Sequence, residues 1–381
     1  MVKPVRKNSN KNPPVFSHEF IIQNHADIVS CVAMVIVVGL MVQATSPIAS
    51  IFITLQHNVT EAGEIPLYSP GIKDWAAVFF YSLICIVVHA IIQEYVLDKV
   101  SKRLHLSKSK LAIFTNSGQL AVFYLASTVW GFDIVIRERY IPDISLLWTD
   151  YPAPLSFMMK LYLIIQLAYS LHEIPELYFQ RTKKEEYVSR AVNSLSSLVL
   201  VSIPYFLNFN RLLLCLLVLD HISELVLHIS QLIQTVDRDD KFTKDCIEIY
   251  LFSVTGLISK VVLIFSRLGS IILAVLTLWF GLAQGEQQEL DIQAGYYNIP
   301  AIRLAILGGI LALQVYLTFN FINQELAQIA KNKETSGATV IAKSKQRKDK
   351  NKKHKKSTNE ESDLPEVDQN TNKNLRKQKI K

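Results

Sequence analysis

The segment "LLLCLLVLDHISELVLHISQLI", residues 212–233, decides the fold class. Fourteen of its residues are Leu, Ile or Val, and an α-helix needs roughly 20 apolar residues to cross a hydrocarbon core of about 30 Å. Half of the 381 residues are hydrophobic, and comparable apolar blocks recur along the chain. The sequence therefore predicts an all-α, polytopic membrane protein.

Eight apolar segments are long enough to be predicted as membrane spans. They cover residues 28–53, 75–95, 119–136, 155–178, 188–207, 212–233, 247–283 and 299–322. The seventh is too long for one upright span, so we expect a tilted or interfacial first half, with the crossing at residues 260–283. The fifth carries Pro204 and is the least apolar of the eight.

Basic residues are concentrated in alternate loops. The segments after the second, fourth and sixth spans are rich in Lys and Arg, whereas the intervening segments are poor in both. Because basic loops stay on the cytoplasmic side, this pattern predicts that both termini are cytoplasmic. The loop after the first span is then lumenal, and it contains the glycosylation sequon Asn58-Val59-Thr60.

Both ends of the chain are polar. No cleavable signal peptide precedes the first span, which is therefore expected to be an uncleaved anchor. Residues 331–381 hold sixteen Lys or Arg, which predicts a disordered tail that contacts anionic lipid or ribosomal RNA. The last six residues, RKQKIK, resemble a dilysine retrieval signal of the endoplasmic reticulum.

The opening segment places ionisable residues at the middle of a span. Asp220, Glu224 and His228 are four residues apart and share one helical face, which His221 borders. Each carboxylate opposes insertion by about 3 kcal/mol, whereas each Leu, Ile or Val favours it by about 0.3–0.6 kcal/mol. Because the sum is close to zero, this polar face is predicted to line a bundle interior or an aqueous cavity.

Other spans supply candidate partners for that face. We predict a polar intramembrane cavity formed by His172, Glu173, Asp220, His221, Glu224, His228 and Arg267. The structural alternative is that Arg267 pairs with Glu224 or Asp220 and holds two helices together. Metal binding by His221, Glu224 and His228 is a further alternative, although their spacing matches no zinc signature.

Acid–base catalysis by these same groups is also open. The four cysteines, at positions 31, 85, 215 and 246, suggest neither a disulfide nor a metal site. We therefore predict no catalytic, cofactor or metal site.

Several segments resemble the translocating chain-associating membrane (TRAM) proteins. They include "HAIIQEYVLDK" at 89–99, "QLAYSLHEIPELYFQRTKKE" at 166–185 and "DHISELVLHIS" at 220–230, and the resemblance extends from about residue 13 to 322. It implies a translocon accessory of the endoplasmic reticulum, beside the Sec channel, that helps signal sequences and weakly apolar spans of nascent polypeptides enter phospholipid. It implies no enzyme activity.

The resemblance also implies a TLC domain, a helical barrel with a polar interior, which ceramide synthases share. The rival function is therefore sphingolipid N-acyl transfer. Tyr205, Asn208 and Arg211 match the spacing of the ceramide synthase motif, but Val192 and Asn193 stand where its paired histidines begin. A lipid-binding or lipid-moving protein is a third possibility.

These observations predict four regions. Residues 1–27 form a cytoplasmic segment, and 28–115 carry the first two spans, partly peripheral, with a lumenal loop. Residues 116–331 form the TLC domain with spans three to eight, and 332–381 form the disordered basic tail.

Overall fold

A computed structural model describes residues 17–60, 65–180, 184–236, 246–285, 288–323 and 325–327. The basic tail at 332–381, most of the N-terminal segment and the basic loop at 237–245 lie outside the described residues, so the predictions made for them concern no described structure. The chain falls into two compact units, residues 1–314 and 315–381. The arrangement described below is that of the first unit.

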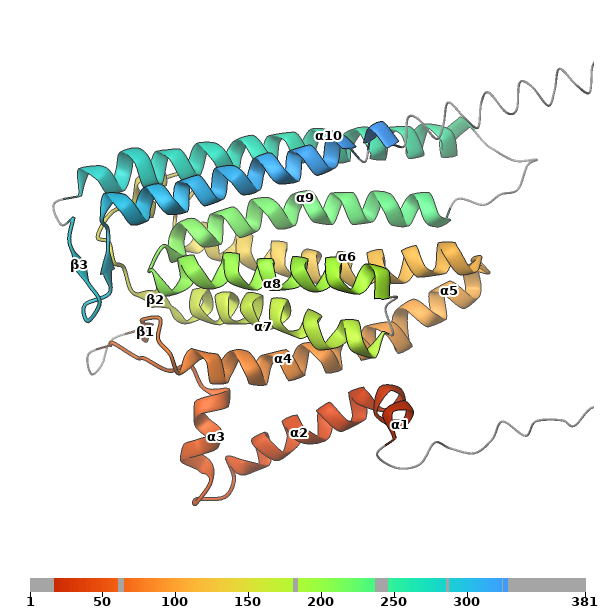
Figure 1. The fold of residues 1–381 in the computed structure, drawn as a ribbon, viewed down its shortest axis with the longest axis horizontal. Coiled ribbons are helices and arrows are strands. Elements are labelled where there is room, and N and C mark those ends of the chain that lie inside the picture. The colour runs from red at the N-terminus through yellow and green to blue at the C-terminus, as the bar shows by residue number, and fades with distance from the viewer. Residues whose placement is uncertain are drawn as a thin grey trace, which may run out of the picture. The chain divides into compact units, whose positions relative to one another are not determined.

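Helices make up most of the described residues (Figure 1). The α-helices are α1 His18–Gln23, α2 His25–Gly39, α3 Ser46–Ile53, α4 Asp74–Ile91, α5 Asp98–Leu104, α6 Lys108–Arg137, α7 Phe157–Phe179, α8 Lys184–Phe206, α9 Asn210–Val236 and α10 Cys246–Ala274. A last helix covers Pro300–Ala327. Two π-helical segments, η1 Ile92–Leu97 and η3 Val275–Gly281, continue α4 and α10. The 3-10 helices are η2 Ile144–Leu147 and η4 Leu282–Gln284.

Among the residues that the structure describes, five helices are long and apolar enough to cross a membrane. They are Asp74–Leu104, Lys108–Arg137, Asn210–Val236, Val254–Gln284 and Pro300–Ala327. The predicted all-α membrane fold is thus confirmed, but the count of eight is not. The fourth and fifth predicted spans are α7 and α8, whose polar residues lower their hydropathy.

The first predicted span, 28–53, is broken into two helices, and the prediction of one continuous helix was wrong. Helix α2 ends at Gly39, and α3 starts at Ser46 with Pro47 in its first turn. Proline has no amide hydrogen to donate, so it suits a helix start and not a helix interior. The hydroxyl of Thr45 donates to the carbonyl of Gly39 at 2.8 Å and stabilises the turn between the helices.

Helix α7 is the centre of the first unit. It packs against α4 and α8, while α6 packs along α9 and α9 along α10. The side chains of Tyr162, Leu163 and Leu167 on α7 are fully buried. The second predicted span was expected to be partly peripheral, but α4 packs on α7 and contributes Ala77 and Val78 to the main core. The burial of α7 among other helices explains how it can carry polar side chains.

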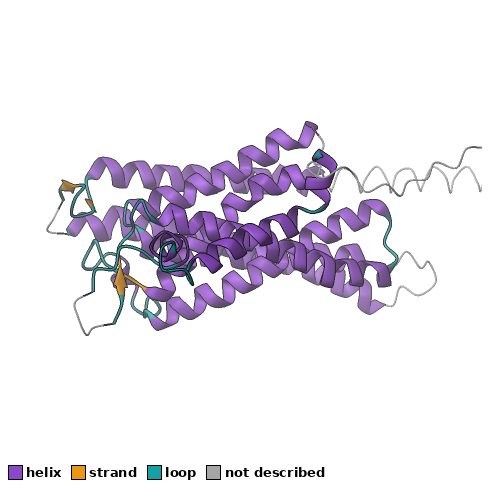
Figure 2. Cartoon of the chain, turned by 90° about the horizontal axis from the view of Figure 1, so that it is seen from below, coloured by secondary structure: helices purple, strands orange, loops and turns teal. Residues whose placement is uncertain are grey.

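Two small antiparallel sheets lie at one end of the long helices, which we call the hairpin end (Figures 1 and 2). Strand β1, Leu67–Tyr68, pairs with β2, Leu155–Ser156. Strand β3, Leu290–Asp291, pairs with β4, Tyr296–Tyr297. The first sheet joins residues 67–68, in the loop after α3, to the start of α7.

Candidate functional site: polar clusters inside the helices

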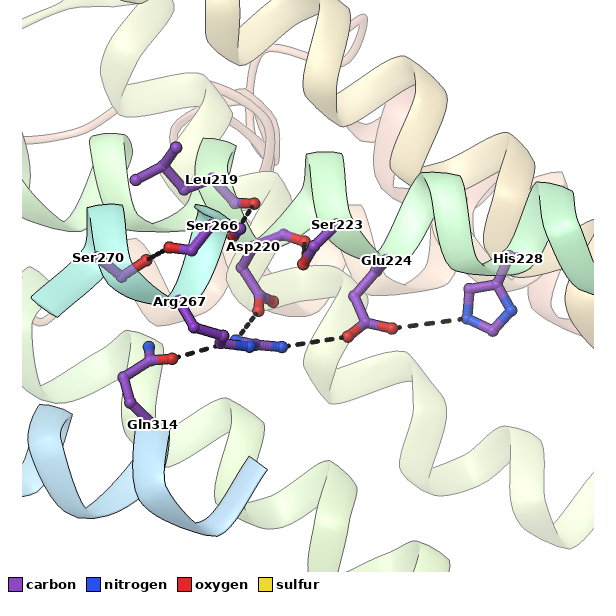
Figure 3. A network of polar contacts seen from close by, with 9 residues as sticks. All are labelled: Leu219, Asp220, Ser223, Glu224, His228, Ser266, Arg267, Ser270 and Gln314. Carbon is purple, nitrogen blue, oxygen red and sulfur yellow. Dashed lines mark hydrogen bonds and ion pairs between the residues drawn. The ribbon is translucent and has the colours of Figure 1, made fainter. Parts of the chain in front are cut away.

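Arg267 of α10 lies at the centre of a polar cluster that it forms with residues of α9, the sixth predicted span (Figure 3). Its guanidinium donates to Asp220 Oδ1 at 2.7 Å and to Glu224 Oε1 at 3.4 Å. Gln314 Oε1 accepts from the same guanidinium at 3.4 Å, and His228 Nε2 lies 3.9 Å from Glu224 Oε2. We call these five residues the α9 cluster.

The α9 cluster arises from helical spacing. Asp220, Glu224 and His228 occupy one face of α9 because they are four residues apart. Ser266 tightens the contact, since its hydroxyl donates to the carbonyl of Leu219 at 2.6 Å. The pairing of Arg267 with two carboxylates was the structural alternative considered from the sequence, and the structure contains both ion pairs.

The cluster is open on its acidic side. The side chain of Asp220 is 39% exposed and that of Glu224 is 23% exposed, whereas that of Arg267 is 7% exposed. One guanidinium therefore serves two carboxylates, and the carboxylates face outward more than the cation does. Such an arrangement can accept water or a polar group of a neighbouring chain at the level of the helices.

His221 points to the other side of α9. Its Nδ1 lies 3.3 Å from the hydroxyl of Tyr162 on α7, and its ring contacts Phe123 and Tyr124 of α6. One residue of helix turns a side chain by about 100°, which separates His221 from its neighbour Asp220. The structure thus does not bring His221 into the α9 cluster.

His172 and Glu173 belong to a second cluster, on α7. His172 Nδ1 pairs with the carbonyl of Tyr169, and the His172 ring lies 5.8 Å from that of His89. His89 Nε2 in turn lies 3.3 Å from Glu176 Oε1. Glu173 interacts with Ser194 of α8. We call His89, His172, Glu173 and Glu176 the α7 cluster.

Aromatic rings lie between the two clusters. Phe123 of α6 stacks on Tyr169 of α7 with 3.3 Å between ring centroids. Tyr124 stacks on His228 at 5.7 Å. The seven residues predicted for one cavity are therefore found in three places. The α9 cluster contains Asp220, Glu224, His228 and Arg267. His221 lies among the aromatic rings, and the α7 cluster contains His172 and Glu173.

A third polar group, which sequence reasoning missed, lies at the hairpin end. The ammonium of Lys160 on α7 is 2.9 Å from Asp74 Oδ1 on α4, and neither residue is exposed. Lys160 also donates to the carbonyls of Gln56 and Ser69 at 2.7 and 2.8 Å. The hydroxyl of Tyr205 donates to Asp74 Oδ2 at 2.7 Å. A lone lysine in the apolar run FMMKLYLII was the available signal.

Backbone groups also bind Asp74 and Lys160, which we call the closed pair because neither side chain is exposed. The amide of Gly71 donates to Asp74 Oδ2 at 2.9 Å, so that both carboxylate oxygens are engaged. The His57 ring packs onto Gly71 so closely that a Cβ there would lie 2.2 Å from its Nε2. Burial lowers the pKa of His57.

Comparison with known proteins identifies the family. Residues 113–323 match the family described as the TLC domain. The chain is 40% identical over 320 residues to translocating chain-associated membrane protein 2 of Homo sapiens, which covers 83% of each chain. The protein of the same name from Mus musculus is equally similar over the same share of both chains.

The chain belongs to the translocating chain-associated membrane protein family. With its apolar helices, this TRAM-family chain is a multi-pass membrane protein. A more distant similarity joins it to a sphingosine N-acyltransferase-like protein of Alternaria alternata, 24% identical over 139 residues, which are 36% of this chain and 32% of that one.

In this TRAM-family chain, the three residues that match the spacing of the ceramide synthase motif bind other parts of the chain at the hairpin end. Tyr205 binds Asp74, as described above. Asn208 Nδ2 donates to the carbonyl of Gly295 at 2.9 Å, in the turn between β3 and β4. Arg211 donates to the carbonyl of Thr149 at 2.8 Å. All three side chains are thus engaged at the hairpin end, and Asn193, at the position of a motif histidine, is exposed on α8.

Metal binding was considered for His221, Glu224 and His228. Within the described ranges, no group of three or more His, Cys, Asp or Glu side chains could hold a metal ion. His221 faces Tyr162, away from the other two, which accounts for this. The sequon residue Asn58 is exposed beside β1, where its Oδ1 accepts the amide of Thr60 at 2.9 Å.

Proposed function

We propose that this TRAM-family protein is an accessory of the protein translocon in the endoplasmic-reticulum membrane. It assists signal sequences and transmembrane segments as they insert, and it supports translocation. The observation that carries the proposal is the 40% identity over 83% of both chains with relatives named for their association with translocating chains. The named association of those relatives and the helical membrane fold of this chain together favour this function over others.

The mechanism that we propose uses the α9 cluster. A charged residue costs a membrane segment about 2.5–3.5 kcal/mol at the helix centre. The partly exposed carboxylates of Asp220 and Glu224 supply hydrogen-bond acceptors at that depth. They admit water and thin the adjacent bilayer, which lowers the cost of lateral exit for a marginally apolar segment. His172, Glu173, His221 and His228 add polarity to the interior of the bundle.

The proposed partners are the Sec channel, nascent secretory and membrane polypeptides, and phospholipid. The basic tail at 332–381 adds contact with the ribosome or with lipid headgroups, and such contact weakens as salt increases. Both termini are proposed to be cytoplasmic, because basic loops follow the second and fourth spans. The sequon loop at 54–73 is then lumenal, and Asn58 is its glycosylation site.

The eight crossings and the TLC-type barrel around a polar interior are also part of the proposal. The three segments beyond the five longest apolar helices are α7, α8 and the bent pair of α2 and α3. Each lies where the sequence predicts a span. The four regions at 1–27, 28–115, 116–331 and 332–381 complete this topology. Endoglycosidase digestion of the wild type and of Asn58→Gln tests the lumenal placement of the loop.

We infer that the chain acts without a catalytic step. The engagement of Tyr205, Asn208 and Arg211 with loops supports this, as does the lack of the paired histidines at 192 and 193. The alternative, sphingolipid N-acyl transfer, predicts product from a sphingoid base and acyl-CoA with the purified protein. A lipid-moving role predicts transfer of labelled phospholipid across vesicles that contain only this protein.

Site-specific crosslinking tests the proposed function. A nascent chain with a marginally apolar signal sequence and a photoreactive residue is halted beside the Sec channel in vesicles with or without this protein. We expect an adduct with the protein and more efficient insertion in its presence. Asp220→Asn/Glu224→Gln should reduce both effects, whereas Asp133→Asn, which alters an exposed pair on α6, should not. No adduct with any signal sequence would contradict the proposal.

A further inference from the structure

A small polar cavity lies at the hairpin end, between the start of α9 and the π-helical segment η3. Asn210, Thr277, Thr149 and Arg211 supply its polar lining, and Leu212 is among its apolar residues. The cavity has a volume of about 10 Å³. Asn210 precedes Asp220 by ten residues, or about 15 Å along the helix, so this cavity is separate from the α9 cluster.

Asn210 lines this cavity with an amide that has no hydrogen-bond partner among the described residues. It is 2% exposed, and both its Nδ2 and its Oδ1 are buried without a hydrogen-bond partner among the described residues. An amide carries donors and an acceptor, and such groups in folded proteins almost always have partners. Its neighbours Asn208 and Arg211, by contrast, each donate to a loop carbonyl.

Thr277 presents a second polar atom to the same cavity. It is 1% exposed, and its Oγ1 has no partner in the part of the chain that the structure describes. A helical threonine commonly donates to the carbonyl four residues before it. Thr277 does not make this bond, and it lies in the π-helical segment η3, a type of helix that occurs frequently at functional sites. Trp148 packs against Gly281 at the end of the same segment.

The size of the cavity decides what can occupy it. A cavity needs roughly 10–15 Å³ to hold one water, and buried waters make about three hydrogen bonds. The three unpartnered atoms are two donors and one acceptor, which is the set that a single water satisfies.

We propose that the cavity is a buried water site. The water accepts from Asn210 Nδ2 and from the hydroxyl of Thr277, and it donates to Asn210 Oδ1. It thereby joins the first turn of α9 to the π-helical segment after α10. This inference does not depend on the proposed function.

A density map of the whole protein in a lipid nanodisc, at a resolution that shows ordered water, tests the site directly. We expect one compact peak within 3.5 Å of both side chains, the usual limit for a hydrogen bond. Its loss is expected in Asn210→Leu/Thr277→Val. An elongated density, or no density beside both wild-type side chains, would overturn the proposal.

Melting temperatures give an independent test. Thr277→Val keeps the shape and removes the hydroxyl, so it should lower the melting temperature by about 2–4 °C. Thr277→Ser keeps the hydroxyl and is the matched control, with a smaller shift. Asn210→Leu/Thr277→Val should lower the melting temperature by less than the sum of the two single shifts, because the pair no longer requires water. Additive shifts would mean that no water links the two residues and would overturn the proposal.

Discussion

Two of the ion-pair systems in the described part of the chain differ in how far their side chains are exposed. At the hairpin end, Asp74 and Lys160 are unexposed, and backbone carbonyls and Tyr205 complete their hydrogen bonds. In the α9 cluster, Arg267 is shared by Asp220 and Glu224, whose side chains remain 39% and 23% exposed. The first system joins α4 to α7, whereas the second joins the consecutive helices α9 and α10.

We interpret this difference in exposure as a difference in role. The pair of Asp74 and Lys160 stabilises the fold, whereas the α9 cluster can interact with other molecules. A buried charge is tolerated when its partner and additional hydrogen bonds replace water, and losing one partner then costs about 3–5 kcal/mol. A partly exposed carboxylate keeps access to other ligands and loses less when its partner is removed. We therefore expect mutations at the hairpin end to unfold the protein and mutations in the α9 cluster to alter its action on other chains.

Lys160→Met should give the largest loss of stability. It leaves Asp74 buried without its cation, and we expect the free energy of unfolding to fall by about 3–5 kcal/mol. Thermal unfolding in nanodiscs, together with the yield of monodisperse protein, measures this. Asp74→Asn/Lys160→Met removes both charges and should recover part of the loss. A variant Lys160→Met as stable as the wild type would show that the closed pair does not hold the fold.

Arg267→Leu should have an intermediate effect on stability, about 1–3 kcal/mol, because water can reach the partly exposed carboxylates that it leaves. Insertion of marginal signal sequences in reconstituted vesicles should change more than the melting temperature does. Arg267→Lys keeps the charge and serves as the control. If Arg267→Leu unfolds the protein as severely as Lys160→Met, the two systems are equivalent and the comparison fails.

Tyr205→Phe should cost about 1.5–3 kcal/mol, the usual value for a hydrogen bond to a charged group, and it should leave insertion activity unchanged. The hydroxyl donates to Asp74 at 2.7 Å, so its loss weakens the closed pair without removing a charge. Tyr151→Phe is the matched control, since that hydroxyl donates to a neutral carbonyl at Leu207. Equal losses in the two variants would show that the charge on Asp74 adds nothing.

The smallest effect is expected from pH. Because burial lowers the pKa of His57 below 6.5, the folded chain takes up this proton less readily than the unfolded chain. Stability is then highest above pH 6.5 and decreases as the pH falls through 6.5 toward the lowered pKa. Melting temperatures of His57→Asn across this range should show a flatter slope than the wild type. His105→Asn, also at a residue with positive φ, is the control; an equal flattening there would contradict this assignment.

The helix ends were predicted most accurately where an apolar segment is bounded by polar residues. Residues 212–233 were expected to span, and α9 is Asn210–Val236. Helix α6 starts at Lys108 instead of Gln119, since Lys108 and Lys110 in its first turn do not look apolar. The break between α2 and α3 was missed because residues 28–53 contain no charged residue, although Gln43, Thr45 and Pro47 interrupt the apolar sequence there.

The polar contacts were predictable only where local spacing creates them. Asp220 and Glu224 share a face at four-residue spacing, and Arg267 is a rare cation in an apolar run, so their pairing could be considered in advance. The contact of Lys160 with Asp74 depends on how α4 packs against α7, which no local pattern encodes. The π-helical turn that exposes Thr277 to the cavity is likewise a product of packing.

The closed pair also constrains the order in which the chain can assemble. Asp74 and Lys160 are 86 residues apart (160 minus 74), and at about 5–20 residues per second the ribosome needs roughly 4–17 s to make the intervening chain. During that interval Lys160 has not been synthesised, so it cannot donate to the carbonyls of Gln56 and Ser69. In the proposed topology, the Asn58 sequon is presented to the glycosylation machinery before Lys160 can bind the carbonyls beside it, and we expect that contact to form late in biogenesis.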